Sequence, residues 1–475
     1  MITETYKGTS YLLLSSLFFI ASGYLINIFL GRRLGPELYG VYGVVIAFWS
    51  GVNLILTAGL PQAVSKFVSE DEKNAESILK SAINLQAIGV LIIGVIYYLL
   101  AETVASAFKD PTLIPYLKLS SFIFPFYSFY SIYTSYYNGL HAFKKQSFMT
   151  IIYSLAKLVS IIGLSINFKL YGAIFGFIIA PTVALLTGFH FPKTVTHQIF
   201  PYKKLLLFSL PLIGFTVFAT LQQSIDLFLV KALIHSGESA GFYTAVQNIS
   251  KIPLFALSAF SLVLFPTISR SVAQNQHEKA TALIQHSLRL VLLVLTPGIL
   301  LISATSKELV TLLFSKTYLP AAYPLSILII GFGFLTLSHI LSNILSGSGS
   351  PKTPLYISLI GAFLSGFFCY LLIPEFGLVG AALASTLASG IGFLLLALLV
   401  YKKFKVFTSF TSFGKVLLAS SIVFFITKAI NPSPLKLILL YPLMFTIYTI
   451  ILILVKEISR QDLNYLKDAV FKRKL

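Results

Sequence analysis

The sequence predicts an all-helical membrane protein with about fourteen transmembrane helices: two related bundles of six helices, followed by one further pair. Three observations lead to this prediction. The mean hydropathy is +0.87, and charged residues make up 11% of the 475 positions, whereas soluble proteins carry roughly a quarter. The apolar residues form runs of about 20, the length that crosses a bilayer core of about 30 Å. Several motifs from the first half of the chain recur in the second half.

The apolar runs can be counted along the chain, with six in each half and two at the C-terminal end. The first run is long for a signal peptide and no small-residue cleavage site follows it, so we interpret it as a transmembrane helix. The predicted spans are residues 11–30, 41–60, 82–101, 114–138, 149–168, 171–190, 205–233, 241–265, 287–305, 324–346, 353–373, 378–400, 414–430 and 435–455.

A duplication accounts for the two sets of six. Pro61-Gln-Ala-Val-Ser-Lys66 is echoed by Pro266-Thr-Ile-Ser-Arg270, and Glu72-Lys-Asn-Ala by Glu278-Lys-Ala-Thr. The offset between matched residues stays between 201 and 208. An even number of spans gives both copies the same orientation, so an axis along the membrane normal should relate them. Duplicated membrane bundles of this kind are typical of transporters whose pathway lies between the halves.

Polar and basic segments divide the chain into five parts. We predict a first six-helix lobe over residues 1–195 and a second over residues 205–400, joined by a cytoplasmic connector at residues 196–204. The extra helix pair covers residues 401–456. In the tail, residues 457–475, apolar side chains recur at helical spacing among basic ones, which favours a short amphipathic helix on the inner leaflet.

The net charge of +19 reflects membrane topology rather than a nucleic-acid surface. With the N-terminus inside, about two thirds of the 35 Lys and Arg residues fall on the cytoplasmic side, as the positive-inside rule requires. Both termini are therefore predicted to be cytoplasmic, in a multi-pass protein of the cell membrane. The excess positive charge attracts anionic lipids of the inner leaflet, and no nucleic-acid partner is expected.

Residues suited to catalysis or metal binding are sparse. Cys369 is the single cysteine, and the acids of the predicted outer loops are scattered rather than paired or spaced as metal ligands. No Gly-Lys motif that could cradle phosphates occurs. We expect no cofactor and no metal, and a transporter rather than an enzyme. A membrane-bound polysaccharide polymerase or glycosyltransferase is the lesser alternative.

Motifs in both halves resemble one family of transporters. Arg32-Arg-Leu-Gly-Pro-Glu-Leu-Tyr-Gly-Val-Tyr42 closes the first span, and Gly59-Leu-Pro-Gln-Ala-Val-Ser-Lys66 follows the second. Leu313-Phe-Ser-Lys-Thr-Tyr-Leu-Pro-Ala-Ala322 and Pro374-Glu-Phe-Gly-Leu-Val-Gly-Ala-Ala382 lie in the second half. In their order and spacing, these strings resemble the polysaccharide (O-antigen type) flippase family of the multidrug, oligosaccharidyl-lipid and polysaccharide exporter superfamily.

The resemblance implies a V-shaped pair of six-helix bundles that works by alternating access. It also implies that the cargo is a polyprenyl-diphosphate-linked oligosaccharide, flipped from the inner to the outer leaflet for cell-surface polysaccharide biosynthesis. A cation-coupled multidrug or small-molecule antiporter of the same fold is the alternative. A polysaccharide polymerase is a candidate partner, and we expect a monomer. Of the two arginines only Arg32 matches the family motif, because Arg33 stands where the family commonly has an apolar residue. The role that the resemblance implies is therefore assigned to Arg32 alone.

Three ionisable residues are predicted deep in the bilayer, where a charge is costly and usually faces a cavity: Lys157, Asp226 and Lys251. Asp226 and Lys251 lie roughly 13 and 15 Å from the outer ends of neighbouring spans, which predicts an ion pair. That pair is either structural or breaks when an anion or a proton arrives. Lys157, roughly 13 Å from the inner end of the fifth span, competes for the same acid. At offsets near 205 the two lysines face Phe363 and Ala47, so the duplication requires neither.

The excess of two cations over one acid predicts a site for an anion such as a diphosphate. For Lys157 the alternative is that the side chain snorkels to the surface. Arg32 and Arg33, at the outer end of the first span, would either bind lipid headgroups or assist release of the diphosphate. Asn53 and Asn84 would either hydrogen-bond sugar hydroxyls or join helices.

Two further features have a functional and a structural interpretation. The aromatic run at residues 122–137 would either stack on sugars or pack in the core. The cytoplasmic loops 61–80 and 267–286 occupy equivalent places in the two repeats, and each is either a solvated extension of its helices or part of an inner gate between the lobes. The gate residues would be Pro61, Lys66, Pro266 and Arg270.

Overall fold

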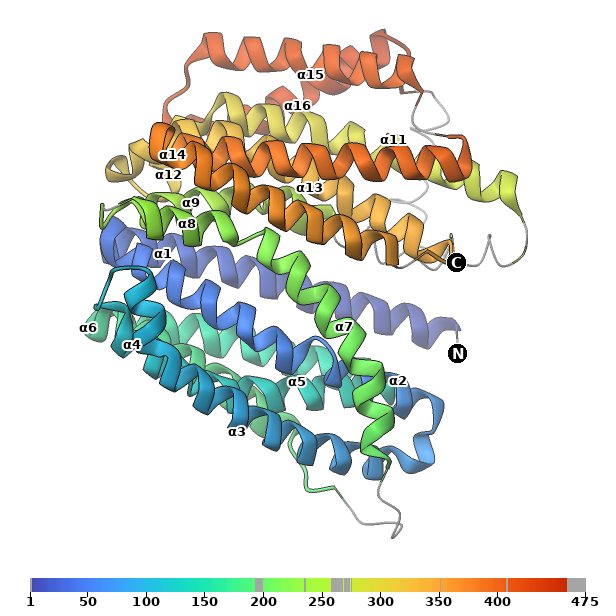
Figure 1. The fold of residues 1–475 in the computed structure, drawn as a ribbon. Coiled ribbons are helices and arrows are strands. Elements are labelled where there is room, and N and C mark those ends of the chain that lie inside the picture. Colours follow the sequence, from blue (N-terminus) through green and yellow to red (C-terminus); the bar gives the residue numbers. More distant parts are fainter. Residues whose placement is uncertain are drawn as a thin grey trace. The chain divides into compact units, whose positions relative to one another are not determined.

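The computed structural model describes residues 2–192, 200–234, 236–257, 268, 274, 276–350, 352–406 and 409–458. Every regular element in these ranges is a helix (Figure 1). Nine of the described helices are long and apolar enough to cross a membrane. The all-helical membrane fold is thus confirmed, while the number of fourteen spans remains a prediction.

Three of the long helices bend sharply at a single residue with positive φ. They are α1 (Ile2–Thr57), α6 (Phe143–Gly188) and α14 (Lys352–Phe404). The bends lie at Gly35, Lys169 and Gly377, with φ values of 73°, 48° and 56°. Each bent helix contains two of the predicted spans, which explains why nine long helices accommodate more than nine apolar runs.

The chain forms two compact units. The first consists of Met1–Asn248 with Ala362–Ala381, and the second of Ile249–Gly361 with Ala382–Leu475. Helices that follow the predicted connector at 196–204 therefore belong to the first unit by their contacts. The division into lobes at 1–195 and 205–400 remains a prediction.

The first unit is built around the bent helices α1 and α6. Around them lie α2 (Leu60–Glu70), α3 (Ala75–Ala107), α4 (Leu113–Ser120) and α5 (Ile123–Gly139), and α1, α3 and α5 run side by side (Figure 1). A short 3-10 turn, Glu72–Asn74, joins α2 to α3. The unit also contains α7 (Tyr202–Gln222), α8 (Ile225–Leu233) and all but the last two residues of α9 (Ser239–Ser250).

The predicted seventh span, residues 205–233, is not one helix. Helix α7 ends at Gln222 and α8 begins at Ile225. The sequence at the break is Gln222-Gln223-Ser224, three polar residues within an otherwise apolar run. Broken helices in membrane proteins occur where the freed backbone groups are buried in protein or line a cavity, so this break is a candidate place for a site.

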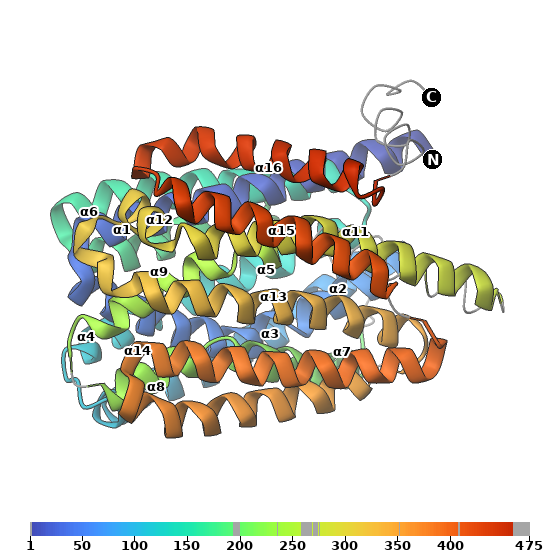
Figure 2. The same ribbon diagram turned by 90° about the horizontal axis from the view of Figure 1, so that it is seen from above.

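The second unit contains α11 (His277–Ala304), α12 (Ser306–Leu313), α13 (Ala322–Gly347), α15 (Phe410–Ile430) and α16 (Leu437–Leu454). Figure 2 shows α15 beside α11 and α16. Short 3-10 turns precede α13, at Lys316–Ala321, and α16, at Pro434–Lys436. Apolar residues of α11 and α13, such as Leu288 and Leu341, form the core of this unit.

An ion cluster ties the end of α16 to this core. The carboxylate of Glu457 lies 2.9 Å from Nε of Arg289 and 3.8 Å from Nζ of Lys415. Arg289 also donates to the backbone carbonyl of Glu457. The C-terminal helix pair is therefore fixed to α11 at the end from which the tail leaves.

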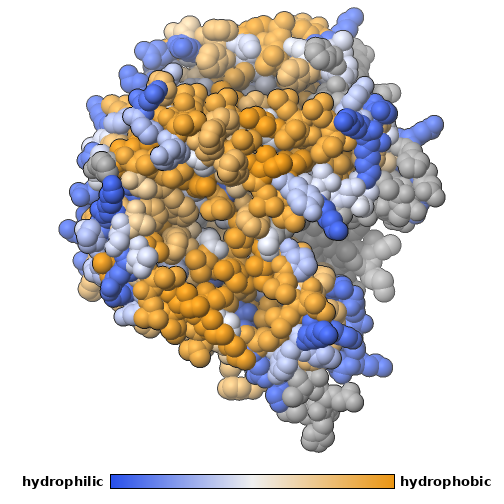
Figure 3. All heavy atoms as spheres, in the orientation of Figure 1, coloured by the Kyte–Doolittle hydropathy of each residue, from blue (hydrophilic) through white to orange (hydrophobic). Residues whose placement is uncertain are grey.

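On the face that Figure 3 shows, hydrophobic residues form a broad central surface and hydrophilic residues gather toward its edges. On α3, Leu91 and Leu99 are 67% and 69% exposed, and on α16 Leu439 is 78% exposed. Exposed apolar surface of this extent indicates contact with lipid. The protein is a multi-span membrane protein.

Candidate functional site

Lys157 lies on α6 with its ammonium group enclosed by aromatic rings. Its Nζ atom is 4.8 Å from the ring centre of Phe19 on α1, and 5.6 and 6.0 Å from the ring centres of Tyr153 and Phe177 on α6. The residue is only 7% exposed. Because α6 turns back on itself at Lys169, Phe177 comes to lie beside residues that precede it by about twenty positions. Three rings thus surround one buried cation.

None of the ion pairs among the described residues involves Lys157. Removing a charge from water without a counter-ion costs several kcal/mol. A cation–π contact returns about 2 kcal/mol when the charge is desolvated. The rings therefore offset only part of the penalty. An anion that reached this ammonium group would be able to pair with it, because no described carboxylate already does. Of the three rings, that of Phe19 is the most exposed.

Further rings continue the aromatic surface beside Lys157. Tyr153 stacks on Tyr130 of α5, with ring centres 5.0 Å apart, and Tyr127 lies 5.8 Å from Tyr153. The ring of Trp49 on α1 meets Tyr127 edge to face at 5.6 Å. Helices α1, α5 and α6 thus converge through their aromatic side chains. The predicted aromatic run contributes two of its tyrosines to this cluster.

The remaining tyrosines of that run hold the far end of α5. The hydroxyl of Tyr136 donates to Glu76 at 2.7 Å, and a ring nitrogen of His190 lies 3.2 Å from the same carboxylate oxygen. Tyr133 and Tyr137 donate to the carbonyls of His190 and Gly188. These hydrogen bonds fix the start of α3 against the ends of α5 and α6, so this part of the run has a structural role.

Asp226 lies in the first turn of α8, directly after the break in the seventh span, and is 2% exposed. Its carboxylate accepts hydrogen bonds from the Tyr243 hydroxyl at 2.7 Å and the Gln247 amide at 2.6 Å, both on α9. The backbone N–H of Leu227 donates to it at 2.9 Å. These partners were not predicted from the sequence. Lys251, the predicted partner, belongs to the second unit, and the Asp226–Lys251 pair remains a prediction.

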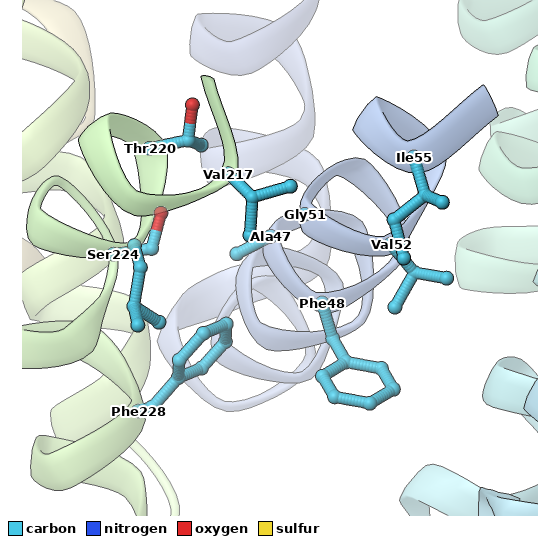
Figure 4. A pocket seen from close by; sticks show the side chains of 10 residues that line it. Ala47, Phe48, Gly51, Val52, Ile55, Val217, Thr220, Ser224 and Phe228 are labelled. Atoms are coloured by element: carbon cyan, nitrogen blue, oxygen red, sulfur yellow. The ribbon is translucent and has the colours of Figure 1, made fainter. Parts of the chain in front are cut away.

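A cavity of about 220 Å³ lies beside the break in the seventh span (Figure 4). Phe48 and Val52 of α1 line one side, and Val217 and Thr220 of α7 line another. Ser224, in the break itself, also lines it. The walls are apolar apart from two hydroxyl groups, so the cavity by itself offers no site for a charged ligand.

The two predicted asparagines have different environments. Asn53 is 4% exposed, and its side-chain oxygen has no hydrogen-bond partner in the part of the chain that the structure describes. Asn84 is exposed and donates to the Tyr202 hydroxyl at 3.2 Å, which joins α3 to α7. Asn84 thus joins helices, as one of its two interpretations proposed, whereas Asn53 retains an unused acceptor.

Arg32 and Arg33 are exposed and lie just before the bend of α1 at Gly35. Arg33 donates to the backbone carbonyl of Ile166 at 3.1 Å, near the bend of α6. The two arginines therefore lie at the same end of the first unit as both bends. They are far along their helix from Phe19, so the structure does not join them to the Lys157 enclosure.

Contacts at this end of the unit close the space between the second span and the helices α8 and α9. A Cβ atom added to Gly40 would lie 2.6 Å from the backbone nitrogen of Gly241, and one added to Gly241 would clash with the carbonyl of Pro36. Asp110, in the loop between α3 and α4, pairs with Lys231 of α8 at 2.5 Å. Burial opposes ionisation of Asp110, but hydrogen bonds from Lys231 and Thr112 outweigh it and hold the pKa of Asp110 below its ordinary value.

The predicted gate residues are only partly described. Pro61 is buried in the first turn of α2, and Lys66 lies 3.5 Å from Glu70 with its ammonium group 4.7 Å from the ring centre of Phe208 on α7. Pro266 and Arg270 lie outside the described residues. The gate between the lobes therefore stays a prediction.

Comparison with known proteins identifies a family whose sequence model matches this chain. The family model described as polysaccharide biosynthesis protein matches residues 29–323. An uncharacterized membrane protein of Methanocaldococcus jannaschii, MJ1375, is 24% identical over 81% of this chain and 94% of its own. The probable low-salt glycan biosynthesis flippase Agl15 of Haloferax volcanii is 26% identical over 31% of each chain.

Two solved structures share the fold at low sequence identity. The lipid II flippase MurJ in an inward closed conformation is 16% identical with a TM-score of 0.78, over 95% of this chain and 99% of that chain. An inward-facing multidrug resistance transporter of the MATE family is 14% identical with a TM-score of 0.66, over 80% of this chain and 94% of that chain. At such identities the likeness concerns the fold alone.

Proposed function

Because the chain belongs to the family of polysaccharide biosynthesis proteins, and is a flippase-type transporter rather than an enzyme, we propose that its cargo is a polyprenyl-diphosphate-linked oligosaccharide. The protein moves this lipid from the inner to the outer leaflet of the cell membrane by alternating access, in the biosynthesis of a cell-surface polysaccharide. Both termini are cytoplasmic, and a polysaccharide polymerase is the expected recipient of the product.

The observation that carries this proposal is the buried ammonium group of Lys157. It lies among three rings, and none of the ion pairs of the described residues involves it. A diphosphate supplies the missing negative charge and several acceptor oxygens, and charge-assisted hydrogen bonds of this kind are about twice as strong as neutral ones. A cationic drug would instead be repelled. Lys157 is therefore the residue that selects an anionic cargo.

The other predicted residues take supporting roles in this proposal. Lys251 is the second cation for the diphosphate, and Asp226 either tunes it or relays a proton. Asn53 offers its unused acceptor to a sugar hydroxyl, and Arg32 assists release at the outer mouth. Contacts such as Gly40 with Gly241 close the outer side while the cargo enters from the inner side.

The test measures flipping of a fluorescent undecaprenyl-diphosphate-linked oligosaccharide in liposomes that contain the purified protein. Lys157→Gln should reduce the initial rate at least tenfold without loss of folded protein, because the amide keeps the size of the side chain but not its charge. Lys145→Gln is the matched control. Lys145 also lies on α6 with its ammonium group 5.0 Å from a tyrosine ring, but it is exposed, so its replacement should leave the rate unchanged.

The outcomes separate the cargo from the site. If wild type flips the lipid and Lys157→Gln does so equally well, the flippase function is supported and the proposed role of Lys157 is wrong. No flipping by wild type, together with efflux of cationic dyes driven by a sodium or proton gradient, identifies the alternative, a cation-coupled antiporter. The buried carboxylate of Asp226 and the likeness to a multidrug transporter fold favour that second candidate function.

A further inference from the structure

The second unit contains a cavity of about 260 Å³ that none of the roles above uses. One wall is formed by α13, which contributes Thr336, His339 and Asn343. The opposite wall consists of Leu254 and Phe255, and Phe255 is 41% exposed. Drug-sized ligands occupy about 300–1,000 Å³, so this cavity has room for one small group rather than for a large molecule.

The polar side chains of this cavity share one face of α13. Thr336, His339 and Asn343 are spaced by three and four residues, the spacing that places side chains in a row on one helical face. The Thr336 hydroxyl donates to the carbonyl of Phe332 at 2.6 Å, which leaves its oxygen free to accept. Within the described part of the chain, neither His339 nor Asn343 has a hydrogen-bond partner from its side chain.

Most ligand classes do not suit this arrangement. The described lining contains neither acidic nor basic residues other than the imidazole, which disfavours a strongly charged ligand. No group of three metal-binding side chains occurs among the described residues. A lipid chain would leave the imidazole and the amide without partners, and each buried polar group left unpaired costs about 1–3 kcal/mol. A ligand with adjacent hydroxyl groups satisfies both.

We propose that this cavity binds one uncharged sugar ring of the cargo. The amide of Asn343 offers two donors and an acceptor, and a neutral imidazole at His339 offers one of each, so the pair can bridge neighbouring hydroxyls. Phe255 supplies a face for the apolar side of the ring. The inference rests on the proposed function and adds a division of labour to it: Lys157 in the first unit binds the diphosphate, and α13 of the second unit binds sugar.

The test compares two fluorescent lipids in the liposome assay, undecaprenyl diphosphate with its oligosaccharide and undecaprenyl diphosphate alone. The double variant His339→Phe/Asn343→Leu keeps the volume of both side chains and removes their hydrogen-bonding groups. We expect it to lower the preference for the glycosylated lipid about tenfold, because two hydrogen bonds are lost. Lys157→Gln should instead slow both lipids by a similar factor.

Controls and outcomes keep the inference separate from the proposed function. Ser338→Ala changes a polar residue of α13 that does not line the cavity and bonds to its own helix, so it should leave the preference unchanged. The single variant His339→Phe serves if the double variant unfolds, and should reduce the preference about threefold. If the variant slows both lipids equally, or slows neither of them, the proposed sugar site is wrong. The proposed flippase function is not affected by that result. Wild type that moves neither lipid overturns both proposals.

Discussion

The helices α6 and α14 bend with the same backbone geometry but have different side chains around the bend. Lys169 in α6 has φ 48° and ψ −127°, and Gly377 in α14 has φ 56° and ψ −130°. Three residues after each bend a glycine packs against the preceding half of its own helix: Gly172 meets the carbonyl of Leu164, and Gly380 that of Leu372. Equivalent positions are therefore 208 residues apart, and the hinge was kept in both copies of the duplicated unit.

At this register the residues around Lys157 have small counterparts. Tyr153, Lys157 and Phe177 of α6 correspond to Gly361, Ser365 and Ser385 of α14. The second copy folds without the cation and without the rings, so the hinge does not depend on them. The duplicated bend requires the glycines but does not require the lysine, and a buried charge that the fold does not require is a candidate for a role in function.

The largest effect should come from the glycines that both copies share. We expect Gly172→Ala and Gly380→Ala each to destabilise the protein by about 1–3 kcal/mol, because a methyl group would clash with a backbone carbonyl that cannot move alone. The measurement is the apparent Tm of the purified protein in detergent. Gly163→Ala, where nothing lies within 4 Å of the added atom, is the control and should be neutral or mildly stabilising. Equal tolerance of all three changes would show that the two hinges are not close-packed.

The second prediction concerns Lys157, whose counterpart in the second copy is Ser365. Lys157→Met should raise the stability by about 1–2 kcal/mol, because the cost of the unpaired buried charge exceeds what the rings return. The same variant should lose flipping, which is the usual exchange between stability and function at a binding site. Conversely, Ser365→Lys should destabilise, since no ring corresponds to Tyr153 at Gly361. If Lys157→Met lowered the apparent Tm instead, Lys157 would be a structural residue.

The sequence predicted the helical class, the duplication and the buried Lys157, because apolar run length and isolated charges are local signals. It did not predict the rings around Lys157. Phe19 lies on another helix, 138 positions away in the chain, so only tertiary packing brings it there. The register of the repeats was also two residues off at α14: an offset near 205 set Lys157 against Phe363, whereas the bends set it against Ser365.

The partners of Asp226 were missed for a similar reason. An estimate of depth along two helices considered only Lys251, and that pair stays a prediction, whereas the break after Gln222 starts a new helix at Ile225. The carboxylate then meets Tyr243 and Gln247 on α9. The polar run Gln222-Gln223-Ser224 is a local signal of that break, but which side chains of α9 meet the carboxylate depends on tertiary packing.

The smallest effect should come from the bend residues themselves. A lysine at φ 48° and ψ −127° is strained, by about 1–3 kcal/mol in general, whereas glycine adopts this conformation freely but is more disordered in the unfolded chain. We therefore expect Lys169→Gly to stabilise the protein by about 0.5–1 kcal/mol and Gly377→Ala to destabilise it by a similar amount. Flipping should be unchanged in Lys169→Gly, since Lys169 is exposed at the bend and lies twelve residues along the chain from Lys157. A loss of flipping at unchanged stability would instead give the basic side chain at this bend a role in transport, and the two hinges would then differ in function as well as in sequence.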